Sequence, residues 1–320
     1  MVNLEGRHRY KGLGTTLVEV LITTGVFSAV MVVLFTMVQY GLDSWRSVEG
    51  RHVTQSMMRK VSIFALDDIR RTCFSKMGVA AYSNYTASDN STPGYSAWAG
   101  GTDITDKIHY GQALWMLSAY KSNPEGDNPG GAAYFGRDST GRPSWKTNIL
   151  YYAAVLSPED HKARYGYEVG KGICKSASTC PHKWLIRREI DTGALLSASD
   201  IKSFLVSPDK VFSSTSASVG GTTVKVLKSQ ILADCIVAFR VVTNKPNVTL
   251  VVKSARLEEL TRSLNKRGMT LQDRAETNAV SQGSLSNEEA LSGLNDTNNS
   301  DVGAYTLQYD IVAVPQNEEE

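Results

Sequence analysis

The sequence feature that most constrains the fold is a run of 23 residues, Val20–Leu42, without a charged side chain. Sixteen of these 23 residues are apolar or aromatic. A helix rises about 1.5 Å per residue, so a helix of this length would be roughly 35 Å long, enough to cross a hydrocarbon core of about 30 Å. We therefore predict one transmembrane helix close to the N-terminus.

The chain as a whole has the composition of a globular protein. Hydrophobic residues make up 42% and charged residues 21% of its 320 residues. These fractions exclude wholesale disorder and a membrane protein with many spans. The 34 Lys and Arg residues nearly balance the 32 Asp and Glu residues. A nucleic-acid-binding protein normally carries a basic excess, so we predict no nucleic-acid partner.

The flanks of the apolar run distinguish three interpretations. Three basic residues precede it within residues 1–11, and Glu19 is the only charge among residues 12–42. A removable secretory signal has a shorter apolar region, of about 7–15 residues, and a small-x-small cleavage site, which Gln39–Asp43 does not provide. An ordinary single-pass anchor explains the length but not the acid. A carboxylate in hydrocarbon costs about 2.5–3.5 kcal/mol, so an acid at this position needs an explanation. Either Glu19 lies in water at the lipid interface, or it has a cationic partner, as in the third interpretation that follows.

The third interpretation depends on the order of residues from Lys11 to Ile22, KGLGTTLVEVLI. This stretch resembles the class III leader of type IV prepilins and type II secretion pseudopilins. The resemblance implies that a prepilin peptidase cleaves between Gly14 and Thr15 and that Thr15 is N-methylated, although this family usually has Phe there. Glu19 is then the fifth mature residue, which in the family contacts the terminal amine of a neighbouring subunit as the helices bundle into a filament.

The downstream pattern predicts that the helix continues and is followed by a β-rich domain. Apolar residues recur at helical spacing between Leu42 and Ile69, so we expect one helix from about residue 16 to about residue 75. Short apolar or alternating runs later in the chain are typical of strands. These runs are Asn148–Leu156, Trp184–Ile190, Lys202–Val206, Val211–Ser213, Thr222–Leu227, Ile231–Thr243, Val248–Leu257 and Tyr305–Val314, with a hairpin at Asn244–Asn247.

The predicted fold class is α+β: a pilin-like long N-terminal helix packed on an antiparallel β-sheet domain. Residues 258–303 are polar, and we expect a surface excursion that is helical near Leu257–Asn265. The predicted organisation is a leader (1–14), a transmembrane or filament-core helix (15–42), an amphipathic continuation (43–77), an irregular Gly/Tyr/Trp-rich insertion (78–147) and a β-rich domain (148–320).

Three tryptophans of the insertion, Trp98, Trp115 and Trp145, allow two interpretations. Aromatic side chains are enriched in protein interfaces, so they could form a contact surface for a partner. They could instead fill a local core, which is the interpretation we favour. The sequence leaves both open.

The resemblance implies a protein that acts by assembly: a minor pilin or minor pseudopilin. The order of Asn148–Leu156, Arg187–Glu189 and Ala233–Arg240 resembles J-type minor pseudopilins and PilW-like minor pilins. The implied partners are a prepilin peptidase, other pilins or pseudopilins, and the inner-membrane assembly platform. The implied location is the inner membrane, with an extracytoplasmic C-terminal domain, and then a periplasmic pseudopilus or a cell-surface pilus. The sequence does not distinguish pilus, secretion and DNA-uptake roles, nor tip from shaft. The alternative is a membrane-tethered enzyme or binding module, whose activity would reside in residues 78–320.

The four cysteines suit one or two disulfides. For Cys174 and Cys180, a small disulfide loop is the expected form if the domain lies outside the cytoplasm. Free thiols, or zinc binding together with His182, are the alternatives. Cys73 and Cys235 are candidates for a second bridge that links helix and sheet.

The sequence contains no recognisable catalytic or cofactor motif. There is no His-Glu-x-x-His, no phosphate loop and no Gly-x-Ser-x-Gly. Asn295–Asp301 is rich in oxygen ligands but lacks the spacing of an EF-hand. We therefore predict no enzymatic activity, no metal and no cofactor.

Overall fold

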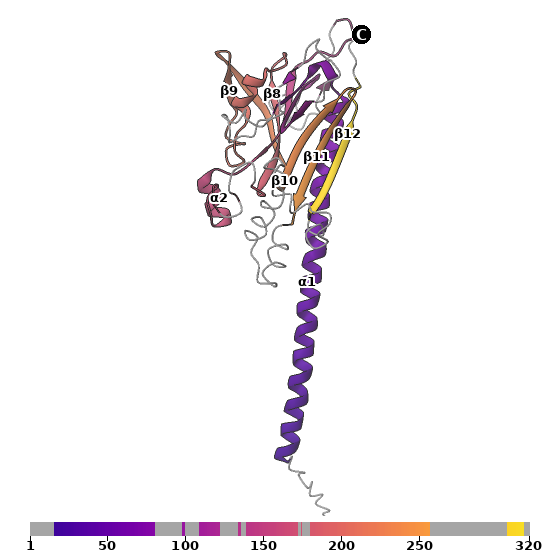
Figure 1. Cartoon of the computed structure of the whole chain (residues 1–320), viewed down its shortest axis with the longest axis vertical. Coiled ribbons are helices and arrows are strands. Elements are labelled where there is room, and N and C mark those ends of the chain that lie inside the picture. The colour runs from indigo at the N-terminus through magenta and orange to yellow at the C-terminus, as the bar shows by residue number, and fades with distance from the viewer. Residues whose placement is uncertain are drawn as a thin grey trace, which may run out of the picture. The chain divides into compact units, whose positions relative to one another are not determined.

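The computed structural model describes residues 16–80, 98–99, 109–121, 134–135, 139–171, 174, 180–256 and 306–316 (Figure 1). The chain divides into two compact units, residues 1–50 and 51–320. Helix α1 (Leu17–Arg70) supplies the described part of the first unit and enters the second.

Helix α1 ends at Arg70, about five residues before the predicted end. The chain then makes a short 3-10 helix, η1 (Phe74–Lys76), preceded by Cys73 in an extended conformation with φ −114° and ψ 158°. The sequence has no Gly or Pro directly after Arg70. The usual signals for the end of a helix are therefore absent, which explains why the predicted helix was too long.

The second unit is built on an antiparallel sheet with the strand order β12-β11-β10-β8-β7-β4-β1-β2. A long N-terminal apolar helix and an antiparallel sheet confirm the α+β prediction. The strands on this path are β1 (Met77–Ala80), β2 (Trp98–Ala99), β4 (Ala113–Ser118), β7 (Thr147–Ala154), β8 (Lys183–Asp191), β10 (Thr222–Asn244), β11 (Asn247–Ala255) and β12 (Thr306–Ala313). Strands β3 (His109–Gly111) and β9 (Ser216–Val219) also pair with β10, and β5 (Tyr120–Lys121) pairs with β6 (Tyr134–Phe135).

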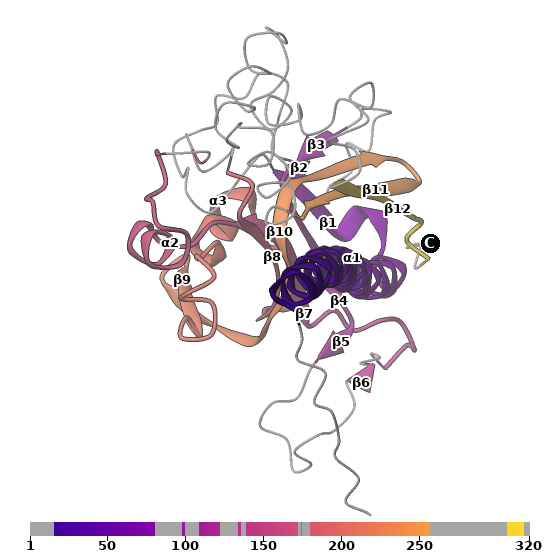
Figure 2. The ribbon, with the colours of Figure 1, turned by 90° about the horizontal axis from the view of Figure 1, so that it is seen from below.

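Both faces of the sheet are covered, which strand β7 shows most clearly. All eight of its positions are buried. Ile149, Tyr151 and Ala153 belong to the core that includes the end of α1, around which the strands curve in Figure 2. The alternate residues of β7 belong to a second core on the other face, together with Phe204 and Ile201. Because side chains alternate along a strand, one strand contributes to both cores.

The end of helix α1 forms one wall of the first core. Met58, Val61, Ala65 and Ile69 are fully buried there. Their spacing of three to four residues places them on one face of the helix. The second core is closed by two short helices, α3 (Ala198–Ile201) and η2 (Lys202–Phe204).

Several predicted strands correspond to observed ones. The hairpin at Asn244–Asn247 joins β10 and β11, in which Asn244 is paired with Asn247. The runs Thr222–Leu227 and Ile231–Thr243 are parts of one strand, β10, whose pairing with β8 shifts register at three places. Such bulges interrupt the alternation of side chains, which explains why the pattern suggested two strands.

Two predicted strands are wrong. Lys202–Val206 contains η2, and Val211–Ser213 lies in turns. Phe204 and Val211 are nevertheless buried in the core, Phe204 at the end of a short helix and Val211 in a turn. A short apolar run does not by itself distinguish a strand from another buried segment.

The segment 78–147 is not only an insertion, because its strands β2, β3 and β4 belong to the central sheet. β4 lies between β7 and β1. Trp115 on β4 is fully buried, and its Nε1 donates a hydrogen bond to the carbonyl oxygen of Leu196 at 2.8 Å. For this tryptophan the core interpretation is confirmed. The predicted leader (1–14), the helix near Leu257–Asn265 and the excursion 258–303 lie outside the described residues.

Candidate functional site

The first part of helix α1 presents an uncovered apolar surface. Among the described residues it is the helix that is long and apolar enough to cross a membrane, with a mean hydropathy of 2.3 in its most apolar stretch, none of which is buried. Phe27 and Phe35 are more than half exposed, at 61% and 63%. Such a surface is stable when lipid or other apolar helices cover it. The helix is therefore compatible with a single-pass membrane anchor.

The threonine and serine hydroxyl groups in this apolar stretch are satisfied within the helix. Thr24 Oγ1 donates to the carbonyl oxygen of Val20 at 2.7 Å, and Ser28 Oγ donates to that of Thr24 at 2.8 Å. Thr36 Oγ1 likewise donates to the carbonyl oxygen of Val33 at 2.8 Å. Bonds to the preceding turn remove the need for water around these groups. The stretch can therefore enter an apolar environment although it contains several hydroxyl groups.

Glu19 lies in the first turn of α1, where the helix begins. Its backbone N–H donates to Thr16 Oγ1 at 3.3 Å and to the Thr16 carbonyl oxygen at 2.9 Å, so Thr16 caps the helix. An acid here also interacts favourably with the positive end of the helix dipole. Gly14 and Thr15, the predicted cleavage site, lie outside the described residues.

A buried ionic cluster connects the end of α1 to the sheet. Arg187 on β8 donates from Nε to Asp68 Oδ2 at 2.6 Å and from Nη2 to Asp68 Oδ1 at 3.0 Å. Its Nη1 donates to Glu189 Oε1 at 2.6 Å. The Tyr151 hydroxyl on β7 also donates to Asp68. A planar guanidinium matches two carboxylate oxygens at once, so this arrangement fixes the helix at one position on the sheet.

The electrostatics of this cluster follow from its burial. Asp68, Arg187 and Glu189 are each at most 6% exposed. Burial lowers the pKa of Arg187, but the hydrogen bond and charge of Asp68 outweigh it, so the pKa is raised overall. The pKa of Tyr151 is raised well above its ordinary value by burial and then by the nearby Asp68 carboxylate. Tyr151 therefore remains a neutral hydrogen-bond donor to Asp68.

The next residue of β8, Arg188, points to the opposite core. Its Nη1 donates to the carbonyl oxygen of Phe204 at 2.7 Å and its Nε donates to Ser229 Oγ at 3.2 Å. Burial lowers the pKa of Arg188. Nearby, the Tyr152 hydroxyl donates to the carbonyl oxygen of Val206 at 2.9 Å, and burial raises the pKa of Tyr152 to about 12. These bonds tie the loop after η2 to the sheet.

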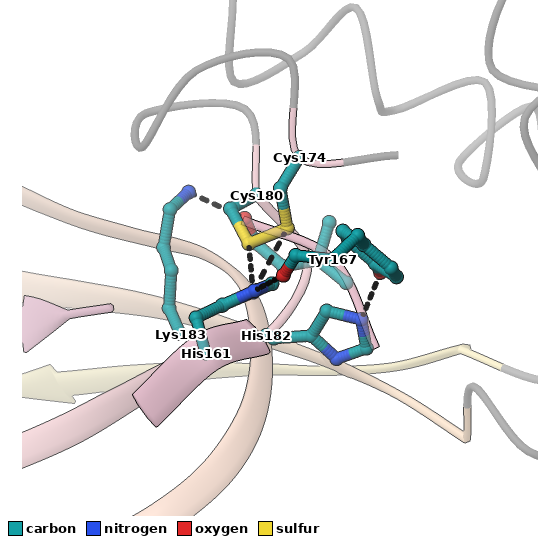
Figure 3. Close-up of a disulfide and its surroundings, with 7 residues drawn as sticks. His161, Tyr167, Cys174, Cys180, His182 and Lys183 are labelled. Carbon is teal, nitrogen blue, oxygen red and sulfur yellow. Dashed lines mark hydrogen bonds between the residues drawn. A yellow bond between two sulfur atoms is a disulfide. The ribbon is translucent and has the colours of Figure 1, made fainter. Parts of the chain in front are cut away.

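A third cluster surrounds the disulfide. Cys174 and Cys180 are bonded with an S–S distance of 2.03 Å, which confirms the predicted bridge (Figure 3). His161 Nε2 lies 3.3 Å from Cys174 Sγ and 3.5 Å from Cys180 Sγ. His161 comes from helix α2 (Pro158–Tyr165), which the sequence did not predict. All three side chains are fully buried.

His182, the imidazole that the sequence paired with these cysteines, occupies a different place. Its Nε2 is hydrogen-bonded to the Tyr167 hydroxyl at 2.7 Å, and its ring stacks on Tyr165 with centroids 3.8 Å apart. Burial, followed by the charges of His161 and Arg164, lowers the pKa of His182 to about 3. Its Nδ1 is buried and has no hydrogen-bond partner in the described structure.

The second predicted bridge, between Cys73 and Cys235, is not formed; both cysteines lie in the described part of the chain. Cys73 Sγ lies 3.2 Å from Ser75 Oγ, so its side chain faces its own segment at the end of α1. Cys235 is in a bulged part of β10 with a positive φ of 51°. A disulfide requires a specific approach of two Cβ atoms, and the positions of two cysteines in the sequence do not show whether they make it.

Comparison of the chain with protein-family models, with curated proteins and with solved structures finds no match.

Two parts of these sites escaped sequence reasoning. Asp68 has no local feature that distinguishes it from other acids of the amphipathic helix, and its partner Arg187 is 119 residues away. A weak signal existed in the consecutive basic pair Arg187-Arg188 within a strand, because a charge that points into a core needs a partner. His161 had no comparable signal, since its spacing from Cys174 matches no standard metal motif.

Proposed function

We propose that this chain is a minor pilin or minor pseudopilin, which a prepilin peptidase cleaves between Gly14 and Thr15. The chain is inserted in the inner membrane, where this cleavage takes place, and it then joins a type IV pilus or a type II secretion pseudopilus through helix α1. Other pilins or pseudopilins and the assembly platform are its partners. The observation that carries this proposal is the uncovered apolar surface of α1, with Glu19 in its first turn.

The energetics of Glu19 favour a partner. The helix dipole stabilises an acid in the first turn by about 0.3–1 kcal/mol. Placing a carboxylate in hydrocarbon costs about 2.5–3.5 kcal/mol, so the dipole does not offset the cost. The α-amine of Thr15 in a neighbouring subunit would supply the missing cation, since such an amine is mostly protonated at neutral pH. Cleavage after Gly14 is what creates that amine.

The second unit supports a role in assembly in two ways. The ion pair between Asp68 and Arg187 fixes the end of α1 to the sheet, so a force on this end of the helix is transmitted to the globular domain. The Cys174–Cys180 disulfide suits an oxidising compartment, such as the periplasm or the cell exterior. Both properties suit a subunit whose globular domain is exported while its helix stays in the membrane or the filament core.

The mature N-terminus tests the processing step. The chain is co-expressed with a prepilin peptidase in a bacterial inner membrane, purified through a C-terminal tag, and analysed by mass spectrometry of its N-terminal peptide. We expect a start at Thr15 that carries an N-methyl group, and a Gly14→Val variant that keeps the leader. An intact Met1, or a start near residue 42, contradicts the proposal.

Glu19 tests the assembly step. In cells that carry the matching pilus or secretion genes, Glu19→Ala should remove the chain from sheared filaments and from detergent-solubilised complexes of minor subunits. Glu49→Ala is the matched control, because Glu49 is an exposed acid on the same helix beyond the apolar run. A membrane-tethered enzyme or binding module predicts the opposite result, in which Glu19→Ala and Glu49→Ala behave alike.

A further inference from the structure

We propose that reduction of the Cys174–Cys180 disulfide converts its surroundings into a binding site for Zn²⁺, with His161 Nε2 and the two cysteine thiolates as ligands. The disulfide and the metal would then be alternative states of one site. This inference is independent of the proposed role in filament assembly.

The distances around His161 are those of a tetrahedral zinc site. Zinc binds thiolate at about 2.3 Å and imidazole nitrogen at about 2.0–2.1 Å, which places a nitrogen and a sulfur ligand about 3.5 Å apart at the tetrahedral angle. His161 Nε2 lies 3.3 Å and 3.5 Å from the two sulfur atoms. All three potential ligand atoms lie within 4.8 Å of one another. Only the sulfur atoms must move apart, and breaking the S–S bond permits this.

The protonation of His161 directs a free lone pair at the sulfurs. Its Nδ1 lies 2.7 Å from the carbonyl oxygen of Tyr167, which can only accept, so Nδ1 carries the proton. In the neutral ring, Nε2 is then a bare acceptor. Figure 3 shows this nitrogen facing the two sulfur atoms of the bridge, which have no proton to donate. Among the described residues, this buried nitrogen therefore has only the two sulfur atoms as neighbours to bond while the disulfide is intact.

The same hydrogen bond is the outer-shell contact that zinc-bound histidines need. A ligating histidine normally donates its other N–H to a carbonyl or carboxylate, which fixes the ring orientation. Helix α2 builds this contact in advance. It ends at Tyr165 and is capped by Gly166, with φ 85°, and the reversal that follows brings the Tyr167 carbonyl back to His161. The left-handed backbone conformation at this position favours glycine, which has no Cβ.

Reduction and metal binding together replace the S–S bond by two S–Zn bonds. A dithiol or phosphine reductant supplies two electrons, the S–S bond breaks, and each sulfur takes up one proton. Zn²⁺ then displaces both thiol protons and binds two thiolates and the neutral imidazole, with water as the fourth ligand. His182 is not a ligand in this scheme, because the group of side chains whose ligand atoms lie within 4.8 Å of one another consists of His161, Cys174 and Cys180.

Metal binding by the full-length chain in detergent tests the proposal. After treatment with a phosphine reductant and removal of excess reagent, the reduced chain should bind one Zn²⁺, measured by elemental analysis and competition with a chromophoric chelator. Co²⁺ in place of Zn²⁺ should show thiolate charge-transfer absorption and the visible bands of a tetrahedral ion. The oxidised chain should bind neither metal. His161→Gln should weaken binding by more than the roughly 10–100-fold that loss of an outer-shell partner costs.

Controls separate a lost ligand from a damaged fold. His182→Gln, which alters a neighbouring buried histidine, should retain metal binding. In the unmodified chain, Zn²⁺ should protect Cys174 and Cys180 from alkylation after reduction while Cys235 reacts at an unchanged rate, a result that needs no variant. The proposal is overturned if the oxidised chain binds equally well, if Zn²⁺ gives no selective protection, or if His182→Gln rather than His161→Gln loses the metal.

Discussion

Replacing Asp68 by asparagine should destabilise the second unit by about 2–3 kcal/mol, although the change removes only one charge. Asp68 accepts two hydrogen bonds from Arg187, at 2.6 and 3.0 Å, and one from Tyr151. Hydrogen bonds to charged groups contribute about 1.5–3 kcal/mol each. An asparagine oxygen can keep part of this set, and Arg187 keeps Glu189 at 2.6 Å, so the loss is smaller than the sum.

Removing the cation of the cluster, by Arg187→Met, should lower the free energy of unfolding more than Asp68→Asn does, because it leaves unbalanced charges behind. The cluster contains two carboxylates and one guanidinium. Asp68→Asn leaves Arg187 and Glu189 as a balanced pair. Arg187→Met leaves Asp68 and Glu189 buried together without a cation, and removing one partner of a buried pair costs about 3–5 kcal/mol. In the double variant Asp68→Asn with Arg187→Met, the loss should be smaller than the sum of the single losses.

Urea unfolding of the detergent-solubilised chain measures these differences, with tryptophan fluorescence as the signal, to which the buried Trp115 contributes. Asp67→Asn is the matched control. Asp67 is adjacent in sequence but half exposed, and it pairs with Arg71 one turn away at 2.8 Å. A surface pair of this kind contributes about 0.3–0.5 kcal/mol.

The ranking of the variants decides the outcome. We expect Arg187→Met to be the least stable, followed by Asp68→Asn, with Asp67→Asn close to the unmodified chain. If Asp68→Asn and Asp67→Asn lose the same stability, the buried pair does not hold the helix to the sheet. A fully additive double variant would likewise refute the coupling between Asp68 and Arg187.

Three further predictions concern the sheet and the thiols. Gly78→Ala should cost about 1–3 kcal/mol in the same assay, because a Cβ there would lie 2.2 Å from Trp115 Cε2; an unchanged midpoint would contradict this close packing. Burial raises the pKa of Tyr152 from 10.0 to about 12. The contribution of the neutral Tyr152 side chain to the free energy of unfolding is therefore complete below pH 10 and is lost as the pH rises toward 12. This is a loss of roughly 3 kcal/mol at about 1.4 kcal/mol per pH unit. Tyr152→Phe should remove that part of the slope in unfolding titrations, and an equally steep loss in this variant would count against the assignment. Finally, alkylation in denaturant without reductant should modify Cys73 and Cys235 alone, read by peptide mass spectrometry, and modification of all four cysteines would exclude the disulfide.

Elements with a strong local pattern were predictable from the sequence. The apolar run and the periodic residues after it indicate helix α1, and the Asn244–Asn247 turn indicates the β10–β11 hairpin. The closing strand β12 was also expected close to its observed bounds. Helix and strand periods are properties of the backbone, so they can be read from neighbouring residues alone. By contrast, helix α2 was missed because its exposed, polar residues give it no apolar face to read, and only His161 within it is buried.

Asp67 and Asp68 show what local pattern cannot supply. In the sequence they are two identical neighbours on an amphipathic helix, yet one lies in water beside Arg71 and the other is buried against Arg187. In the same way, His182 lies two residues from Cys180, but His161 from a separate helix faces the sulfurs.

From the sequence alone, the anchor-like helix, the α+β class and the candidate disulfide follow, because each depends on residues close together in the chain. Tertiary structure alone decided which acid is paired, which histidine meets the disulfide, and which cysteines remain thiols. Those outcomes depend on which faces of distant elements pack together, and packing is settled by burial summed over the whole domain rather than by any single stretch of residues.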